Sequence, residues 1–396
     1  MPSLNILFLA AHLPVLGVHG GGTRMYHNLK ALASKHSVSL ISFIESELEQ
    51  DSLASLEPLG ICVRTILRKP VSPRHLLVPK PREHDEYASQ AMGLAVRQAL
   101  AGQRFQVVQA EYSQMAQHVP VVPAVYRILT EHEVAFANAR ADLSLPAPWY
   151  IKLKRWYEWM VQLNYEVQAC RRFHRVVCMT DEDREALGRF VPSRNLRAIP
   201  IGVDCDYFCP GENLPECSAV PSVLFVGNYR HSPNQNAVYC FAEDILPRVR
   251  QIIPQTEFNV VGGNIQLLDA RRLSGCGPVN LIGRVEDIRP CYWNADVFVA
   301  PIWSGNGMRV KVLEALSMAK AVVATPLALQ GLRPGPVEIC RTADSPQRFA
   351  GETVRLLQDA QARRQLGANA RSRMLAEYDW RLIGRQLLEL VENRDA

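Results

Sequence analysis

The chain has 396 residues, of which 48% are hydrophobic and 21% charged. This is enough for about two domains with cores of their own, and it excludes a disordered, collagen-like or small disulfide-stapled chain. Lys and Arg (44) exceed Asp and Glu (39) for a net charge of +5, too small an excess to predict a dedicated nucleic-acid binder.

No segment reaches the roughly 18 consecutive apolar residues of a membrane-spanning helix. The ten cysteines include no CxxC pair, so we expect reduced thiols in a cytoplasmic protein. Cys205, Cys209 and Cys217 lie close together, but their spacing is irregular and no histidine is near, so we expect no metal.

The first forty residues predict a βαβ unit. The continuous apolar run Asn5–Ala11 is typical of a parallel strand buried on both faces. The glycine loop Gly17–Thr23 follows, then a helix opened by Thr23, then a strand over Val38–Phe43. Parallel strands joined by helices imply a doubly wound sheet, whose ligands bind at the carboxyl ends of the strands.

The rest of the first half continues this alternation after a helical and loop-like stretch over 46–104. Strands are predicted over Phe105–Glu111 and Val125–Glu131, and His132 follows the second directly. A long helix over Trp149–Arg175 leads into the strand Arg175–Met179.

A second alternation follows the linker. Strands are predicted at Ser222–Gly227, Glu257–Gly263, Asn280–Gly283, Asp296–Pro301 and Ala321–Thr325, and helices at Asn236–Arg250, Met308–Met318 and Tyr378–Val391. We therefore expect an α/β protein of two Rossmann-like parallel-sheet domains facing a cleft. Their expected limits are 1–205 and 222–377, with a linker over 206–221 and a C-terminal helix over 378–396 that packs back toward the N-terminal domain.

The segment 301–316 carries the most chemical information. Gly305 and Gly307 let the backbone approach a ligand closely, and the helix after them offers unpaired N–H groups to an anion. Arg309 and Lys311 add full positive charges, and the carboxylate of Glu314 can accept hydrogen bonds from ribose hydroxyls. A glycine-capped surface helix with solvated charges is the alternative for this pattern alone.

Several such segments together resemble the retaining GT-B glycosyltransferases of family 4. They occur in the family's order and spacing over nearly the whole chain: Gly20–Gly22, Glu131–Glu133, Ile201–Asp204 with Phe208 and Pro210, Gly283–Asp287, and Gly305–Leu316 leading into Ala321–Thr325. The segment Phe225–Asn234 and the loop Met308–Lys311 resemble the branch that builds bacterial exopolysaccharide and other surface glycans.

The resemblance implies a function and a set of site residues. It implies metal-independent transfer of a sugar, with retention, from a nucleotide-sugar to a glycan or lipid-linked acceptor. The implied catalytic residues are His132, Arg309 and Lys311. The implied substrate-binding residues are Gly21, Gly22, Arg230, Val285, Glu286, Asn306, Gly307, Met308 and Glu314.

The chain departs from the family pattern at two positions. Asn306 stands where the first of two glutamates is usual, and Arg230 has no accompanying lysine. An amide can still hydrogen-bond sugar hydroxyls but supplies no charge. We expect Arg309 and Lys311 to replace the missing lysine charge around the diphosphate.

Two further questions stay open at this stage. A sugar-nucleotide epimerase, or a non-catalytic sugar-nucleotide sensor, would share the same architecture. The basic, tryptophan-rich segment 149–159 either packs its aromatic side chains on its own domain or lies on the inner face of a membrane. Packing on its own domain fits better, because the sequence shows no clean separation of apolar from basic residues.

Overall fold

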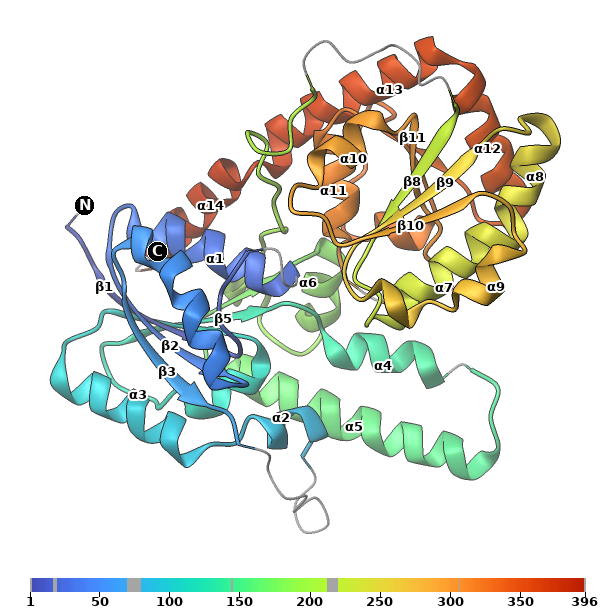
Figure 1. The fold of residues 1–396 in the computed structure, drawn as a ribbon. Coiled ribbons are helices and arrows are strands. Elements are labelled where there is room, and N and C mark those ends of the chain that lie inside the picture. Colours follow the sequence, from blue (N-terminus) through green and yellow to red (C-terminus); the bar gives the residue numbers. More distant parts are fainter. Residues whose placement is uncertain are drawn as a thin grey trace. The chain divides into compact units, whose positions relative to one another are not determined.

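The chain forms two compact units. We call them the first unit, Met1–Pro200 with Ile383–Ala396, and the second unit, Ile201–Leu382. Each contains one parallel sheet with helices around it (Figure 1), which confirms the predicted fold class. The computed structural model describes residues 2–16, 20–69, 80–143, 145–211, 220–305 and 307–394.

The sheet of the first unit has seven parallel strands in the order β3-β2-β1-β4-β5-β6-β7. Their bounds are β1 Asn5–Ala10, β2 Ser37–Ile44, β3 Cys62–Leu67, β4 Val107–Glu111, β5 Tyr126–Glu131, β6 Arg175–Cys178 and β7 Leu196–Ala198. The strand β3 falls within a stretch predicted to be helix and loop. It lies at the sheet edge with alternating partial burial, so it lacks the continuous apolar run by which buried strands are recognised.

Helices connect these strands. They are α1 Gly20–Ala33, α2 Arg82–Glu86, α3 Gln90–Gly102, α4 Ala135–Leu143, α5 Trp149–Arg171 and α6 Asp181–Gly188, with 3-10 turns η1 Glu47–Leu59, η2 Ser113–His118 and η3 Ser193–Asn195. The prediction that Thr23 opens the first helix is wrong, because α1 begins at Gly20 and the glycines form its first turn. From Ile383 onward α14 (Trp380–Glu392) belongs to the first unit, where a Cβ added at Gly384 would lie 2.8 Å from the Ala31 Cβ of α1.

The sheet of the second unit has six parallel strands in the order β10-β9-β8-β11-β12-β13. The strands are β8 Ser222–Val226, β9 Glu257–Val261, β10 Val279–Gly283, β11 Val297–Ala300, β12 Ala321–Ala324 and β13 Arg341–Thr342. The helices are α7 Ser232–Cys240, α8 Leu246–Ile252, α9 Ala270–Ser274, α10 Arg289–Asn294, α11 Val310–Ser317, α12 Pro346–Gln358 and α13 Ala360–Arg373. Shorter turns are η4 Phe241–Ile245, η5 Ile265–Leu267, η6 Pro326–Leu329 and η7 Met374–Tyr378.

The single helix predicted over Asn236–Arg250 is two helices joined by the π-helical turn η4. Pro247 lies at the start of α8. A proline removes one helical hydrogen bond and clashes with the carbonyl four residues before it, and a wider π turn relieves that clash.

Both sheets reverse their strand order beside their first strand. In the first unit β2 and β4 lie on opposite sides of β1, and in the second unit β9 and β11 lie on opposite sides of β8. In open parallel sheets, ligands bind at the carboxyl ends of the strands at such a switch point. Each unit therefore has one favoured edge for a ligand.

The aromatic residues at the start of α5 do not pack into their own unit as the sequence favours. Trp149 is 77% exposed and Trp156 is 52% exposed, whereas Trp159 packs against the core. The carboxyl-terminal half of α5 is held in the core through Val167 and Cys170. Figure 1 shows α4 running beside α5.

Candidate functional site

In the second unit the candidate residues gather at the carboxyl ends of β8 and β11. The loop Gly227–His231 follows β8, and the residues after β11 lead into α11. Gly305 has φ +89° and Gly307 φ +83°, a backbone region that favours glycine. Asn306 lies outside the described residues.

Lys311 on α11 is the centre of this cluster. Its Nζ donates to the Asn234 Oδ1 at 2.6 Å and lies 4.4 Å from the centre of the Phe225 ring. Burial, together with the charge of Arg309, lowers the pKa of Lys311 to about 7. The ammonium therefore lies in a site that holds a cation poorly until an anion joins it.

Glu314 lies one turn further along α11. The Tyr292 hydroxyl of α10 donates to its Oε2 at 3.0 Å. Burial raises the pKa of Glu314 to about 7, although Tyr292 and Lys311 both act to lower it. Sequence reasoning missed Tyr292, because a tyrosine 22 residues away gives no local signal.

Two glycines allow close backbone packing at the end of β8. A Cβ added at Gly227 would lie 3.2 Å from the Lys311 Nζ, and one added at Gly262 would lie 1.8 Å from the Gly227 carbonyl oxygen. Gly262 also has φ +135°. The two glycines thus let β8 and β9 end close together beneath Lys311.

The surroundings of α11's first turn are positively charged. Arg309 is the N-cap residue of α11 without a side-chain capping bond, and its guanidinium Nη2 donates to the Ser304 carbonyl at 3.4 Å. Burial lowers the pKa of His231, and the charges of Arg309 and Lys311 lower it further. Arg230 is exposed beside His231, and Gly307 and Met308 are partly exposed before the helix.

The loop after β10 is fixed by an ion pair. Arg289 donates to both carboxylate oxygens of Asp287, through Nε at 3.0 Å and Nη2 at 2.7 Å, and lies 4.3 Å from the centre of the Tyr207 ring. These hydrogen bonds lower the pKa of Asp287 to about 2. Val285 and Glu286 follow the carboxyl end of β10; Val285 is partly exposed and Glu286 is exposed.

In the first unit His132 lies at the corresponding edge, after β5. Its Nε2 is 2.7 Å from the Glu111 Oε2 at the end of β4. Burial would raise the pKa of Glu111, but hydrogen bonding to His132 and the charge of buried Arg24 outweigh it, so the pKa is lowered. Burial also lowers the pKa of His132, so a neutral imidazole donates from Nε2 to the carboxylate.

Tyr112 connects His132 to the first turn of α1. Its ring stacks on the imidazole with centroids 3.8 Å apart, and its φ of +75° is unusual for a non-glycine residue. A Cβ added at Gly21 would lie 1.8 Å from the Tyr112 hydroxyl and 3.4 Å from the His132 Nδ1. Gly21 therefore allows the amino end of α1 to meet this pair, and Gly22 beside it is buried.

Neither Glu111 nor Tyr112 was predicted from the sequence to be functional. The available signal was an acidic residue that ends a buried strand. Burial of such a residue is costly unless the fold gives it partners. Here Gln109 and Thr130 also donate to Glu111, at 2.6 and 3.2 Å.

A small cavity of about 80 Å³ lies beside this cluster, lined in part by Tyr112, Glu131 and Glu166. Glu166 on α5 accepts backbone hydrogen bonds from Ala135 at 2.9 Å and Phe136 at 2.8 Å, at the start of α4. Burial raises the pKa of both carboxyl groups, and for Glu131 the charge of Glu166 adds to this. The carboxyl groups of Glu131 and Glu166 can therefore accept hydrogen bonds from a ligand and, when protonated, donate them.

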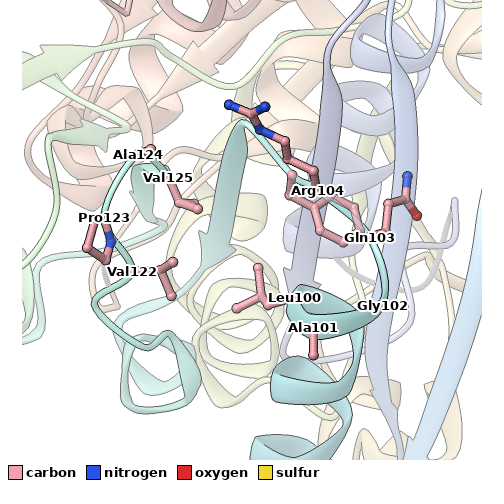
Figure 2. A pocket seen from close by; sticks show the side chains of 10 residues that line it. Leu100, Ala101, Gly102, Gln103, Arg104, Val122, Pro123, Ala124 and Val125 are labelled. Carbon is pink, nitrogen blue, oxygen red and sulfur yellow. The ribbon is translucent and has the colours of Figure 1, made fainter.

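A larger cavity of about 320 Å³ lies elsewhere in the first unit (Figure 2). It is lined by Leu100–Phe105 and Val122–Val125, which precede β4 and β5. It thus lies at the amino ends of these strands, the edge that parallel sheets do not use for ligands.

Within the described part of the chain, no group of three or more His, Cys, Asp or Glu is arranged to hold a metal ion. Cys217 lies outside the described residues. None of the helices that the structure describes is both long and apolar enough to cross a membrane.

Models of glycosyltransferase families match both halves of the chain. A model described as Glycosyltransferase Family 4 matches residues 18–207, and one described as Glycosyl transferases group 1 matches residues 220–359. A phosphatidyl-myo-inositol mannosyltransferase from Mycobacterium tuberculosis is 28% identical over 49% of this chain and 53% of its own length. The chain thus spans about half the length of the first curated relatives it matches.

Two other similarities extend over nearly the whole chain. An uncharacterized 44.6 kDa protein in the cps region of Klebsiella pneumoniae is 21% identical over 95% of this chain and 96% of its own. The structure of Anabaena HepE in complex with UDP has a TM-score of 0.72 at 15% identity, over 98% of this chain and 100% of its own. The two family models and this shared fold confirm the resemblance found in the sequence, and the chain belongs to the family 4 glycosyltransferases of GT-B fold.

Proposed function

We propose that this protein transfers a sugar from a nucleotide-sugar donor to a glycan or lipid-linked acceptor. The observation that carries the proposal is the Lys311–Glu314–Tyr292 cluster at the carboxyl edge of the second unit's sheet. Family membership supports transfer, and the UDP bound to HepE supports a nucleotide donor. The cps region of one relative supports a role in bacterial surface polysaccharide biosynthesis.

The diphosphate of the donor fits beside the positively charged side chains of Arg309 and Lys311. Cleavage of the anomeric C–O bond leaves negative charge on the departing diphosphate. Arg309, Lys311 and the amino end of α11 are arranged to meet that charge, and preorganised donors of this kind are each worth on the order of 3 kcal/mol in the transition state. These protein cations take the part of a metal, so we propose metal-independent transfer.

Glu314 fits the ribose of the nucleotide. Its carboxyl group is fixed by the Tyr292 hydroxyl through Oε2. A carboxyl group can bond two vicinal hydroxyls at once, which a diphosphate lacks. Val285 and Glu286, in the loop fixed by Arg289, are the candidates for contact with the base.

His132 fits a role in polarising a hydroxyl. The carboxylate of Glu111 accepts a hydrogen bond from Nε2–H of His132, which leaves Nδ1 as the acceptor of a neutral imidazole. Such a nitrogen accepts a hydrogen bond from a sugar hydroxyl, whereas a phosphate oxygen would need a donor. The cavity lined by Glu131 and Glu166 supplies further partners for hydroxyl groups.

Retention follows from the family resemblance. We propose front-face transfer, in which the departing phosphate helps to deprotonate the acceptor hydroxyl. The new glycosidic bond forms as the bond to phosphate breaks, and the acceptor proton passes to the phosphate oxygen.

The test uses the purified chain with a panel of UDP-, GDP- and dTDP-sugars, with and without a membrane extract. Acceptor-dependent release of nucleoside diphosphate supports transfer. Interconversion of the sugar nucleotide without acceptor would indicate an epimerase, and binding without turnover would indicate a sensor. A Lys311→Met sample serves as the background control.

A further inference from the structure

One face of α5 is apolar, aromatic and exposed. We call it the aromatic face, and it consists of Trp149, Tyr150, Leu153, Trp156, Tyr157 and Met160. With 100° between successive helical residues, these six positions fall within roughly one third of the helix circumference. Exposure ranges from 77% at Trp149 to 39% at Met160. Soluble proteins rarely expose a contiguous apolar patch of this kind unless it takes part in binding.

Other contacts of α5 show where this helix packs on its own unit. The Trp159 indole donates to the Phe136 carbonyl of α4 at 3.0 Å, and Leu163 packs against the core of the first unit. Further along, Glu166 and Cys170 are buried on the same side. The helix thus packs on its own unit mainly through its carboxyl-terminal half, which also buries Val167, whereas its amino-terminal half leaves the aromatic face exposed.

The charges beside the aromatic face fit an anionic surface. Lys152 and Lys154 are exposed and border the face on its two sides, and Arg155 lies behind it. Glu158 is the single acidic residue in 149–160, and its Oε1 lies 3.7 Å from the Lys154 Nζ. Tryptophan and tyrosine favour the boundary between lipid headgroups and acyl chains, because their rings are apolar at one end and polar at the other.

We propose that the aromatic face of α5 binds the headgroup region of a bilayer that contains anionic lipid. The rings enter the boundary layer, and Lys152 and Lys154 meet lipid phosphates on either side. The membrane contact is independent of catalysis. Its use, however, rests on the proposed function, because the contact would bring the enzyme to a lipid-linked acceptor.

The experiment measures co-sedimentation of the full chain with vesicles of phosphatidylcholine, with and without phosphatidylglycerol, in the absence of any sugar nucleotide. We expect binding to the anionic vesicles and a blue shift of tryptophan fluorescence. The double variant Trp156→Ser/Tyr157→Ser should lose most of the binding. Lys152→Ser/Lys154→Ser should weaken binding by about tenfold or more, since each lysine near an anionic surface contributes on the order of 1 kcal/mol.

Matched controls change other exposed residues of the first unit. Leu48→Ser/Val121→Ser removes two exposed apolar side chains, and Lys30→Ser/Lys69→Ser removes two exposed lysines. Both should bind vesicles like the parent, and circular dichroism checks that every variant is folded. Equal vesicle binding by the aromatic-face variant and its control would overturn the proposal.

A second copy of the chain is the other occupant that the test can detect. If sedimentation without lipid shows a dimer that Trp156→Ser/Tyr157→Ser converts to a monomer, and vesicles do not bind, the face is a self-association surface and the proposal is wrong. Because no step uses donor or acceptor, failure here leaves sugar transfer untouched. Likewise, inactivity toward every donor would leave the vesicle result standing.

Discussion

At the scale of single residues, the proposed chemistry depends on two groups whose pKa values the fold has moved toward neutrality. Lys311 has its pKa lowered to about 7 and Glu314 has its pKa raised to about 7. Both shifts have burial as their largest cause, so the charged form of each group is disfavoured in the absence of a ligand. A diphosphate would favour the charged lysine, and ribose hydroxyls would bond the carboxyl group.

Lys311→Met should lower turnover by about 100-fold or more, because it removes a charge aimed at the leaving group. Between pH about 7 and 10.5 the unfolded chain binds more protons than the folded chain at this residue, so the lysine makes the parent more stable as pH rises through that window. The Tm of Lys311→Met minus the Tm of the parent should therefore decrease from pH about 7 to about 9.

Thermal scans across this pH range, with exposed Lys30→Met as the control, check the sign. A Tm difference between Lys311→Met and the parent that does not change with pH would mean that Lys311 is not titrating in a buried site.

Glu314→Ala should weaken UDP binding by about 10- to 150-fold, the loss expected for hydrogen bonds to a charged group. Inorganic pyrophosphate has no ribose, so its affinity should not fall in this variant. Lys311→Met should weaken the binding of both ligands. Calorimetric titration of the two variants with the two ligands separates the roles, and an equal loss of pyrophosphate affinity in Glu314→Ala would refute contact with the ribose.

At the scale of elements, the first turn of α1 depends on the absence of a side chain at Gly21. Gly21→Ala would place a Cβ 1.8 Å from the Tyr112 hydroxyl, so α1 or the tyrosine must move. We expect a loss of stability of roughly 1–3 kcal/mol, the usual range for overpacking, and a loss of activity through His132. Urea unfolding measures the first effect and nucleotide release the second.

Two matched variants sharpen this test. Gly351→Ala, inside α12 where an added Cβ meets nothing within 4 Å, should not destabilise and should gain up to about 1 kcal/mol from the helix preference of alanine. Tyr112→Phe in the Gly21→Ala background removes the hydroxyl that the Cβ meets, and it should recover part of the lost stability. Without any such recovery, the strain must arise from the helix backbone and not from Tyr112.

At the scale of the whole molecule, nucleotide binding should be confined to the second unit. Amide hydrogen exchange of the full chain with UDP at 100 times its Kd should slow by up to about 100-fold wherever binding opposes local opening. We expect this protection at Gly227–His231, at Arg284–Ile288 and at the start of α11. Protection limited to the first turn of α1 and to His132 would place the nucleotide in the first unit instead.

The sequence by itself determined the two parallel sheets and the family. Strands such as Asn5–Ala10 and Val297–Ala300 are continuous apolar runs, and a run of this kind is visible without knowledge of its neighbours. Glycines before helices and charged residues at fixed offsets along α11 are likewise local patterns. The edge strand β3 was missed, because half-burial leaves no such run.

Only the tertiary structure decided which side chains meet and which faces stay exposed. His132 meets Glu111 because β5 lies beside β4, and Lys311 meets Asn234 because α11 and α7 both begin at the carboxyl edge of one sheet. The aromatic face of α5 has a composition that would suit a core, and its exposure depends on which part of the helix other elements cover, since Val167 in the same sector further along α5 is buried. Local patterning sets the form of each element, whereas burial and pKa depend on neighbours that are distant in the sequence.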